Sequence, residues 1–356
     1  MRIRIYPIIL AGLLWSCDSG STSVSARGDG SLSNAFGGSS VGLNDIVWKF
    51  RAESEGPTTV MATAKHAYVT GADGKLRAFV AGSGDAVWEA ELGASSFGEI
   101  TVTPRRILVG TNDGVVAVGL DGAKQWTHRA EAPVDGAVLV HESVAYFGSR
   151  DGSIWAVDAI GGTLIWRAKT AGPLASGCAL AGDAVLCGGG DGYLWKLDAA
   201  TGEALWSWSP SAPVRGVAVA GGRVVVTAGT RVVSLGLDEP KEHWQFDLGR
   251  PVETPPTIVG GAVIAATGEG DVVSLDADDG SQAWRVTVGA PVRGAITASG
   301  GTLYVPATSA GVVAVSASTG EEQWRFRTDG LVVGGPVPSG GKLFIADHAG
   351  SVYAID

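Results

Sequence analysis

The chain has little of several things that would mark a specialised class of protein. Only three of its 356 residues are cysteine, so it is not a mini-protein stapled by disulfides. Lys and Arg number 26 against 36 Asp and Glu, and the formal net charge of -10 argues against a general nucleic-acid binder. Beyond the N-terminus no apolar run approaches the roughly 20 residues of a membrane-spanning helix. Only 17% of residues are charged while 45% are hydrophobic, which excludes a disordered chain.

Glycine, in contrast, is abundant, with 54 copies in the chain. The glycines do not recur at every third position, which excludes a collagen-like helix. They separate short bursts of apolar residues, as turns separate the strands of an all-β protein. The composition therefore predicts a β fold that is rich in tight turns.

Residues 1–16 have the pattern of a secretory signal peptide. Arg2 and Arg4 precede the short apolar stretch from Ile5 to Leu14, and Cys17 follows the small residue Ser16. The segment resembles a bacterial lipobox, which implies cleavage before Cys17 and a diacylglycerol group on its sulfur. The alternative is an ordinary signal peptide with a cysteine there by chance. The resemblance implies a periplasmic protein of the bacterial cell envelope, held by its lipid in a membrane that we expect to be the outer membrane.

Residues 17–45 form the next unit in this interpretation. After Cys17 the sequence is dominated by glycine and serine, a composition typical of a flexible tether. Such a tether would hold a folded domain away from a membrane surface. We therefore expect a signal peptide at 1–16, the lipidated cysteine with its linker at 17–45, and one folded domain at 46–356.

A sequence repeat fills the folded domain, and tryptophans mark its period. Eight of the 12 tryptophans recur at a nearly constant interval, each in similar surroundings. These ladder tryptophans are Trp48, Trp88, Trp126, Trp166, Trp206, Trp244, Trp284 and Trp324. A period of about 40 residues is typical of β-propellers and of some other repeat folds.

One copy of the repeat shows four short β-rich runs separated by turn residues. The runs are Thr254–Val259, Ala262–Ala266, Asp271–Leu275 and Gln282–Val286. The first two are joined by Gly260-Gly261, a two-residue hairpin signal. Four short antiparallel strands in one period of the repeat predict one blade of a β-propeller.

The repeat count predicts eight blades. Seven complete copies end at successive tryptophans from Trp88 to Trp324, and three more strands follow before the chain ends at Asp356. At the other end, residues 46–50 form a tryptophan strand with no three strands before it. Joining the two fragments completes an eighth blade and leaves no open sheet edge. We therefore expect an eight-bladed propeller whose last blade pairs N-terminal and C-terminal strands.

The repeat resembles the PQQ-like, or quinoprotein-type, propeller family. The best-matching copy, residues 188–206, reads GGGDGYLWKLDAATGEALW. Eight such blades behind a lipobox resemble the BamB family of outer-membrane assembly lipoproteins. The resemblance implies a scaffold without enzymatic activity or cofactor, which assists the insertion of outer-membrane β-barrel proteins. It also implies that the partner is the periplasmic part of a BamA-like insertase, and that each ladder tryptophan docks its blade on the next.

Two cysteines lie in the fourth copy. If Gly182-Asp183 is a hairpin turn, Cys178 and Cys187 face each other across it, near disulfide distance. A disulfide and two free buried thiols both remain open.

Two nearly identical segments are candidates for partner binding. Residues 212–216 read APVRG and residues 290–294 again read APVRG, each on the approach to an innermost strand. Arginine there would face the channel or its rim, where it could bind a partner or form a salt bridge within the repeat. The BamB-type resemblance places docking residues at Val214, Arg215 and Glu253, and we add Arg293 from the second segment.

Other functions remain open at this point. The chain could be a different tethered recognition module, such as a sensor or a surface-binding lipoprotein. It could also be a PQQ-dependent dehydrogenase, although it lacks the adjacent cysteine pair of those enzymes. We find no catalytic constellation, and none of the five histidines has metal-ligand spacing. The sequence therefore predicts no enzyme and no metal site.

Overall fold

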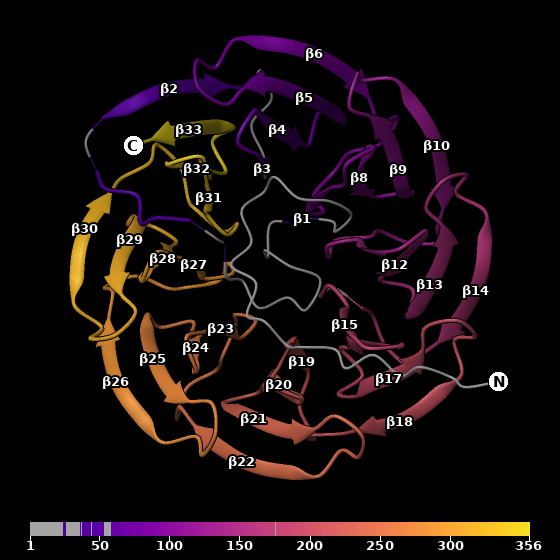
Figure 1. Cartoon of the computed structure of the whole chain (residues 1–356), viewed down its shortest axis with the longest axis vertical. Helices are drawn as coiled ribbons and strands as arrows, with labels where there is room; N and C mark the ends of the chain where they lie inside the picture. Colours follow the sequence, from indigo (N-terminus) through magenta and orange to yellow (C-terminus); the bar gives the residue numbers. More distant parts are fainter. Residues whose placement is uncertain (1–23, 26–35, 37, 44, 53–57, 175) are drawn as a thin grey trace, which may run out of the picture.

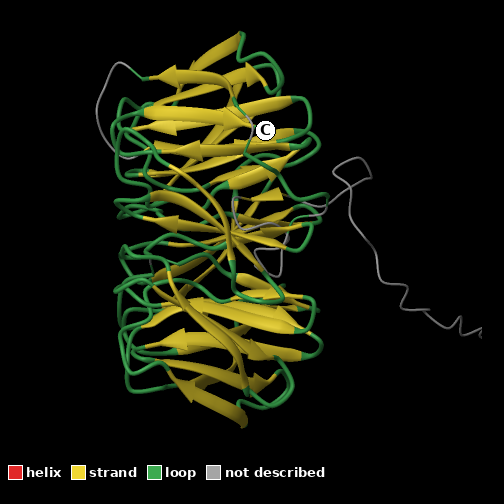
Figure 2. Ribbon diagram, turned by 90° about the vertical axis from the view of Figure 1, so that its left-hand side faces the viewer, coloured by secondary structure: helices red, strands yellow, loops and turns green. Residues whose placement is uncertain are grey.

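The computed structural model describes residues 24–25, 36, 38–43, 45–52, 58–174 and 176–356 of the chain. In these residues all regular secondary structure is β-strand, arranged as eight antiparallel sheets around a central axis (Figure 1). In the side view the sheets stand beside one another to form a disc (Figure 2). The predicted eight-bladed propeller is therefore confirmed. In the described part of the chain no helix is long and apolar enough to cross a membrane.

We name the blades A to H in chain order, and each runs outward from its innermost strand. Blade A contains β3 (Thr58–Ala62), β4 (His66–Gly71), β5 (Lys75–Val80) and β6 (Ala86–Glu91). Blade B contains β7 (Ile100–Val102), β8 (Arg106–Thr111), β9 (Gly114–Gly119) and β10 (Lys124–Arg129). Blade C contains β11 (Leu139–His141), β12 (Val144–Gly148), β13 (Ser153–Asp158) and β14 (Leu164–Lys169). Blade D contains β15 (Ala179–Ala181), β16 (Ala184–Gly188), β17 (Leu194–Asp198) and β18 (Ala204–Trp208).

The remaining blades complete the ring. Blade E contains β19 (Val214–Ala220), β20 (Arg223–Ala228), β21 (Arg231–Gly236) and β22 (Glu242–Asp247). Blade F contains β23 (Thr257–Val259), β24 (Ala262–Ala266), β25 (Asp271–Asp276) and β26 (Gln282–Thr287). Blade G contains β27 (Thr297–Ser299), β28 (Thr302–Ala307), β29 (Gly311–Ser316) and β30 (Glu322–Phe326). Blade H contains β31 (Val337–Ser339), β32 (Lys342–Ala346), β33 (Ser351–Ile355) and the N-terminal strand β2 (Ile46–Arg51).

Strand position within a blade explains the apolar bursts of the sequence. The middle strands pack against neighbouring blades on both faces, so that every residue of β9 is buried. The outermost strands alternate between exposed and buried residues, as β14 does, because one of their faces meets solvent. The hydrophobic core is accordingly a series of clusters between adjacent blades, such as the cluster that joins Leu108 of blade B to Phe147 of blade C.

The strands predicted for blade F agree with the structure except at the innermost one. The structure begins β23 at Thr257, where the prediction began at Thr254. Pro255 and Pro256 occupy the intervening positions, and proline has no N–H for the sheet ladder. Val252, before the prolines, still forms an isolated bridge with Thr267 of the same blade.

The ring closes as predicted. Strand β2 pairs with β33 in antiparallel register, so that Trp48 lies opposite Ala354. Residues before β2 contribute as well, although the sequence analysis assigns them to the linker. The backbone N–H of Phe36 donates to Ala298 of blade G, and the N–H of Val41 donates to the Tyr304 hydroxyl. In addition, β1 (Val24–Ser25) pairs with β7 and gives blade B a fifth strand.

Each ladder tryptophan bonds its blade to the next one. The indole Nε1 of Trp126 in blade B donates to the Ala159 carbonyl of blade C at 3.1 Å, and the other seven make equivalent bonds of 2.9–3.3 Å. At the last seam Trp324 donates to the carbonyl of Val41 at 3.3 Å. In the other blades the acceptor carbonyl lies after the third strand. At the last seam Val41 of the N-terminal segment takes its place.

A glycine on the neighbouring blade makes room for the indole at six of these seams. Gly162 has a φ of 72°, and a Cβ there would lie 2.6 Å from Cε3 of Trp126. The glycine therefore meets two demands, a left-handed backbone and a flat surface for the indole. Equivalent contacts link the remaining pairs: Gly84 and Trp48, Gly122 and Trp88, Gly202 and Trp166, Gly280 and Trp244, Gly320 and Trp284.

We expect Gly162→Ala to lower the free energy of unfolding by about 1–3 kcal/mol more than Gly249→Ala, because of overpacking at the seam. Gly249 has nearly the same φ, 75°, but a Cβ there would meet nothing within 4 Å. The control thus carries the backbone strain without the contact. Denaturant unfolding of both variants measures the difference. Equal losses would show that the indole contact contributes nothing.

Candidate functional site

The channel entrance is built by the segments that lead into the innermost strands. In blades C, E and G these segments share the order Ala-Pro-Val-x-Gly, at residues 132–136, 212–216 and 290–294. The valine is at most 5% exposed in each: Val134, Val214 and Val292. It therefore packs into the core and fixes the segment, while the residue after it is left at the channel entrance.

The glycine that ends the segment allows the next blade to approach closely. A Cβ on Gly216 would lie 2.5 Å from the Cα of Pro255 in the segment leading into blade F. A Cβ on Gly294 would lie 2.4 Å from the carbonyl oxygen of Val333, leading into blade H. Backbone thus packs on backbone at these points, and the preceding arginine projects away from the contact. Arg215 is accordingly exposed.

The position between valine and glycine lies nine residues after a ladder tryptophan, and we call the position with this spacing in each blade the ring position. The described chain supplies Phe97, Asp135, Arg215, Glu253, Arg293 and Val333 at this phase of the repeat, for blades B, C, E, F, G and H. Four of these six line a single cavity of about 370 Å³: Arg215, Glu253, Arg293 and Val333. Three of the four residues predicted to bind a partner, Arg215, Glu253 and Arg293, therefore line the same cavity.

The fourth, Val214, also lines the cavity but is buried. Its side chain is 5% exposed and belongs to the hydrophobic cluster between blades D and E. Because so little of it is accessible, it offers almost no surface to a partner. Val214 instead packs in the core and thereby fixes the backbone next to Arg215.

The two arginines of the cavity have different environments. Nε of Arg293 lies 3.4 Å from Oε2 of Glu253, so Arg293 forms a salt bridge, but between the neighbouring blades F and G and not within one repeat. The side chains are 60% and 36% exposed, and an ion pair with that exposure contributes about 0–1 kcal/mol. A second pair joins ring residue Asp135 to Arg150 through Nε and Oδ2.

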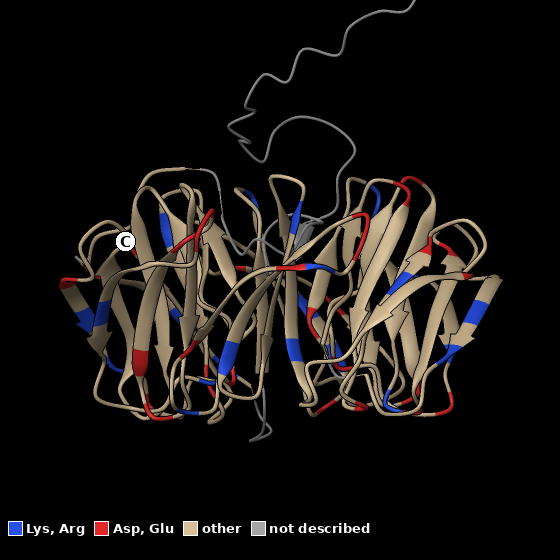
Figure 3. Cartoon of the chain, turned by 90° about the horizontal axis from the view of Figure 1, so that it is seen from below, with Lys and Arg blue, Asp and Glu red and all other residues tan. Residues whose placement is uncertain are grey.

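Arg215 has no such neighbour among the residues that the structure describes. Its guanidinium makes neither an ion pair nor a hydrogen bond there, although its side chain is exposed at the cavity. A guanidinium carries five N–H donors in a planar fork that matches the two oxygens of a carboxylate. Charged residues of both signs are spread around the disc (Figure 3). The arrangement suits recognition of a carboxylate.

The cavity is not suited to a quinone cofactor with its calcium ion. Calcium takes six to eight oxygen ligands. The charged residues that line the cavity are Glu99, Arg215, Glu253 and Arg293, two carboxylates with two guanidinium groups. Among the described residues no group of three His, Cys, Asp or Glu side chains could hold a metal ion. The residues present therefore do not fit this cofactor.

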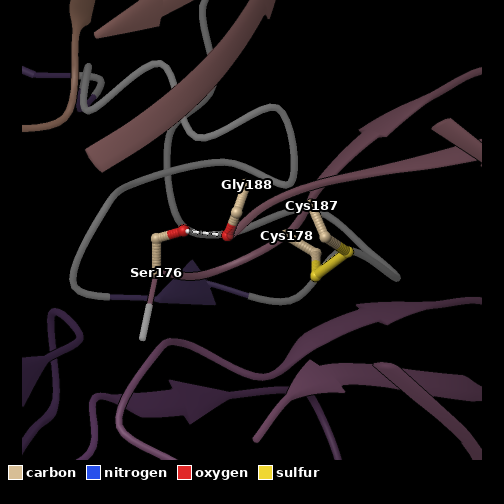
Figure 4. Close-up of a disulfide and its surroundings, with 4 residues drawn as sticks. All are labelled: Ser176, Cys178, Cys187 and Gly188. Carbon is tan, nitrogen blue, oxygen red and sulfur yellow. Dashed lines mark hydrogen bonds between the residues drawn. A yellow bond between two sulfur atoms is a disulfide. The ribbon is translucent and has the colours of Figure 1, made fainter. Parts of the chain in front are cut away.

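The remaining predicted positions lie apart from the cavity or at its border. Cys178, directly before β15, forms a disulfide with Cys187 of β16, with Cα atoms 4.5 Å apart (Figure 4). The eight ladder tryptophans lie on the outermost strands, where they join blades. Cys17 lies outside the described residues.

Sequence reasoning missed Asp135, Phe97 and Val333 as ring residues. Their positions in the repeat could have identified them, since each occupies in its own blade the position that Arg215 occupies in blade E. Asp135 could have been found from the shared Ala-Pro-Val start of its segment. Phe97 and Val333 lie in segments without the proline, and only the spacing to the ladder tryptophans locates them.

Fold and cavity define a class of protein, an eight-bladed propeller of the quinoprotein type whose channel entrance carries charged side chains. The sequence profile described as "Outer membrane protein assembly factor BamB" matches the chain at residues 14–119, 39–152, 111–216, 207–295 and 268–356. Because these matches together cover most of the chain, it belongs to the BamB family. No curated protein sequence matches it significantly.

Solved structures share the fold at low sequence identity. BamB from Moraxella catarrhalis superposes with a TM-score of 0.74 at 17% identity, over 87% of this chain and 98% of that one. A quinohemoprotein alcohol dehydrogenase from Pseudomonas putida reaches 0.78 at 13% identity, over 93% and 79%. A europium-containing methanol dehydrogenase reaches 0.75 at 12% identity, over 92% and 89%. These similarities show the propeller, which both scaffolds and enzymes use.

Proposed function

We propose that the chain is a non-catalytic, lipid-anchored docking protein of the machinery that assembles β-barrel proteins in the bacterial outer membrane. Membership of the BamB family supports the general role, and that family implies a place in the bacterial envelope. The signal peptide and the lipid on Cys17 belong to the proposal. They would hold the propeller at a membrane surface.

The observation that carries the docking role is the exposed guanidinium of Arg215 at the channel entrance. It lies in a cavity large enough for a few side chains, beside the weak pair of Arg293 and Glu253. A partner segment with one carboxylate can bind Arg215 through two parallel hydrogen bonds. The periplasmic domains of a BamA-like insertase are the partner that we propose.

Co-purification tests this proposal. A tagged full-length chain, expressed in its source bacterium and extracted from membranes in mild detergent, is expected to carry the insertase with it. Mass spectrometry of the eluate identifies the partners, and a tagged chain without residues 46–356 serves as the control for binding to the linker. Recovery of the propeller without any insertase subunit would contradict the proposed function.

A PQQ-dependent dehydrogenase is the second candidate, and the structural similarity to two such enzymes motivates it. The donor set of the cavity argues against it, as described above. Dye reduction after addition of PQQ and Ca²⁺, with alcohols or sugars as substrates, would revive the enzyme. We expect no reduction above the rate without protein.

A further inference from the structure

The disulfide lies beside the channel entrance, on the blade that precedes Arg215. It joins Cys178, the residue directly before the innermost strand β15, to Cys187 in β16, next to the pair Ala179–Leu186 of the hairpin ladder. Both cysteines are 1% exposed and pack with blade C residues such as Tyr146. The bond is therefore part of the core.

The segments that flank the disulfide reach the wall of the cavity. Ser176 lies shortly before Cys178, and Gly190 lies shortly after Cys187, and both line the cavity with Arg215. The Ser176 hydroxyl donates to the carbonyl of Gly188 at 3.2 Å, which ties the two ends together (Figure 4). The disulfide therefore holds this part of the wall at a fixed width.

The same wall supports the residue before Arg215. The N–H of Val214 donates to the carbonyl of Gly189 at 3.2 Å. A Cβ on Gly188 would lie 2.4 Å from Cγ1 of Val214, so the valine side chain rests directly on the backbone of β16. A shift of this backbone would carry Val214 with it, and Arg215 is the next residue.

Three other blades, B, F and G, fix their innermost strands by a side-chain bond that blade D does not make. Three threonines on innermost strands donate to the backbone of the next blade at 2.6–2.7 Å: Thr101 to Val138, Thr257 to Ile296, and Thr297 to Pro336. Ala179 occupies the equivalent position of blade D, counted from the hairpin turn, and alanine has no hydroxyl. Blades A, C, E and H have no threonine at this position either, and in blade D the disulfide lies directly beside it and adds a covalent constraint.

We propose that the Cys178–Cys187 disulfide positions Arg215 for docking, so that the partner binds tightly only to the oxidised protein. This inference rests on the proposed function, because it concerns the same cavity. The disulfide does not touch the partner. It acts through Ser176, Gly188 and Val214, by keeping the guanidinium in the conformation that binds, which lowers the ordering cost of association.

Binding measurements on the full chain test the inference, with the purified periplasmic domains of the insertase as the probe. We expect Cys178→Ala/Cys187→Ala and dithiothreitol-reduced wild type to bind about tenfold more weakly than the oxidised protein. Dithiothreitol should not change the affinity of the double variant. Gly320→Ala serves as the matched control, because it strains the Trp284 seam in another part of the ring. We expect it to lower the Tm without changing the affinity.

Each result has a definite meaning. Unchanged affinity of the double alanine variant overturns the positioning role while the proposed function stands. Equal weakening in Gly320→Ala also overturns it, because general destabilisation would then account for the loss. No binding by the oxidised wild type overturns the proposed function and the positioning role together. Hydrogen exchange adds a local readout, and we expect faster exchange at Val214 in the double variant than in the control.

Discussion

Replacing Arg215 by glutamate is expected to abolish docking to the insertase. The substitution removes the guanidinium that has no partner among the described residues of the cavity, and it brings a second carboxylate next to Glu253. Loss of one member of a desolvated charge pair costs about 2–5 kcal/mol of binding free energy, which corresponds to about 30-fold or more in Kd. Titration of the periplasmic insertase domains on immobilised protein measures the change.

Two other arginines provide the comparison. Arg105 is exposed in the turn between β7 and β8, away from the cavity lining, so Arg105→Glu is expected to leave Kd unchanged. Arg293→Gln breaks only the exposed pair with Glu253 and is expected to change stability by less than about 1 kcal/mol. An unchanged Kd in Arg215→Glu would show that the partner, if any, binds elsewhere.

Replacing Trp48 by alanine is expected to cause the largest loss of stability, about 3–5 kcal/mol, as for large buried aromatic side chains in general. Trp48 is 8% exposed, packs against Phe79 and Phe344, and donates to the carbonyl of Ala81 at 3.0 Å. It therefore joins the closing blade H to blade A. Equilibrium unfolding in urea measures the loss as a lower midpoint.

The conservative variant Trp48→Phe separates the two contributions. It keeps an aromatic ring and removes the hydrogen bond, so we expect a loss of about 1–2 kcal/mol. Leu205→Ala is the surface control, because Leu205 is 53% exposed on an outermost strand, and we expect a change within about 0.5 kcal/mol. A loss below about 1 kcal/mol in Trp48→Ala would mean that closure depends little on this seam.

The fold could be predicted from the sequence because its determinants are local and repeated. The ladder tryptophans fall on outermost strands, and the glycines that contact them follow slightly less than one repeat period later, as Gly162 follows Trp126. The main error was the start of β23, where two prolines prevent ladder bonds. Residues 36 and 38–43 belong to the segment predicted from its composition to be a linker, and Phe36 and Val41 in it bond to blade G. Val41 nonetheless lies one repeat period before Ala81, which accepts the equivalent tryptophan bond.

The charge pairing at the cavity could not be predicted in the same way. Glu253 lies one repeat period after Arg215 and one before Arg293, so all three have the same phase in the repeat. Spacing therefore makes both arginines neighbours of this glutamate. Which one it pairs with depends on side-chain direction around the channel, and the structure pairs it with Arg293. That Arg215 is left without an ion pair among the described residues therefore follows from the folded structure and not from the spacing of the repeat.

The pairing of the first long strand with the last one has a consequence for biosynthesis. Strand β2 cannot pair with β33 until the C-terminal end of the chain has been synthesised. At a synthesis rate of about 5–20 residues per second, the roughly 300 residues between the two strands take roughly 15–60 s to appear. Throughout that time the backbone N–H and C=O groups of β2 lack their partners in β33. Completion of the ring therefore has to follow the synthesis of the last strand.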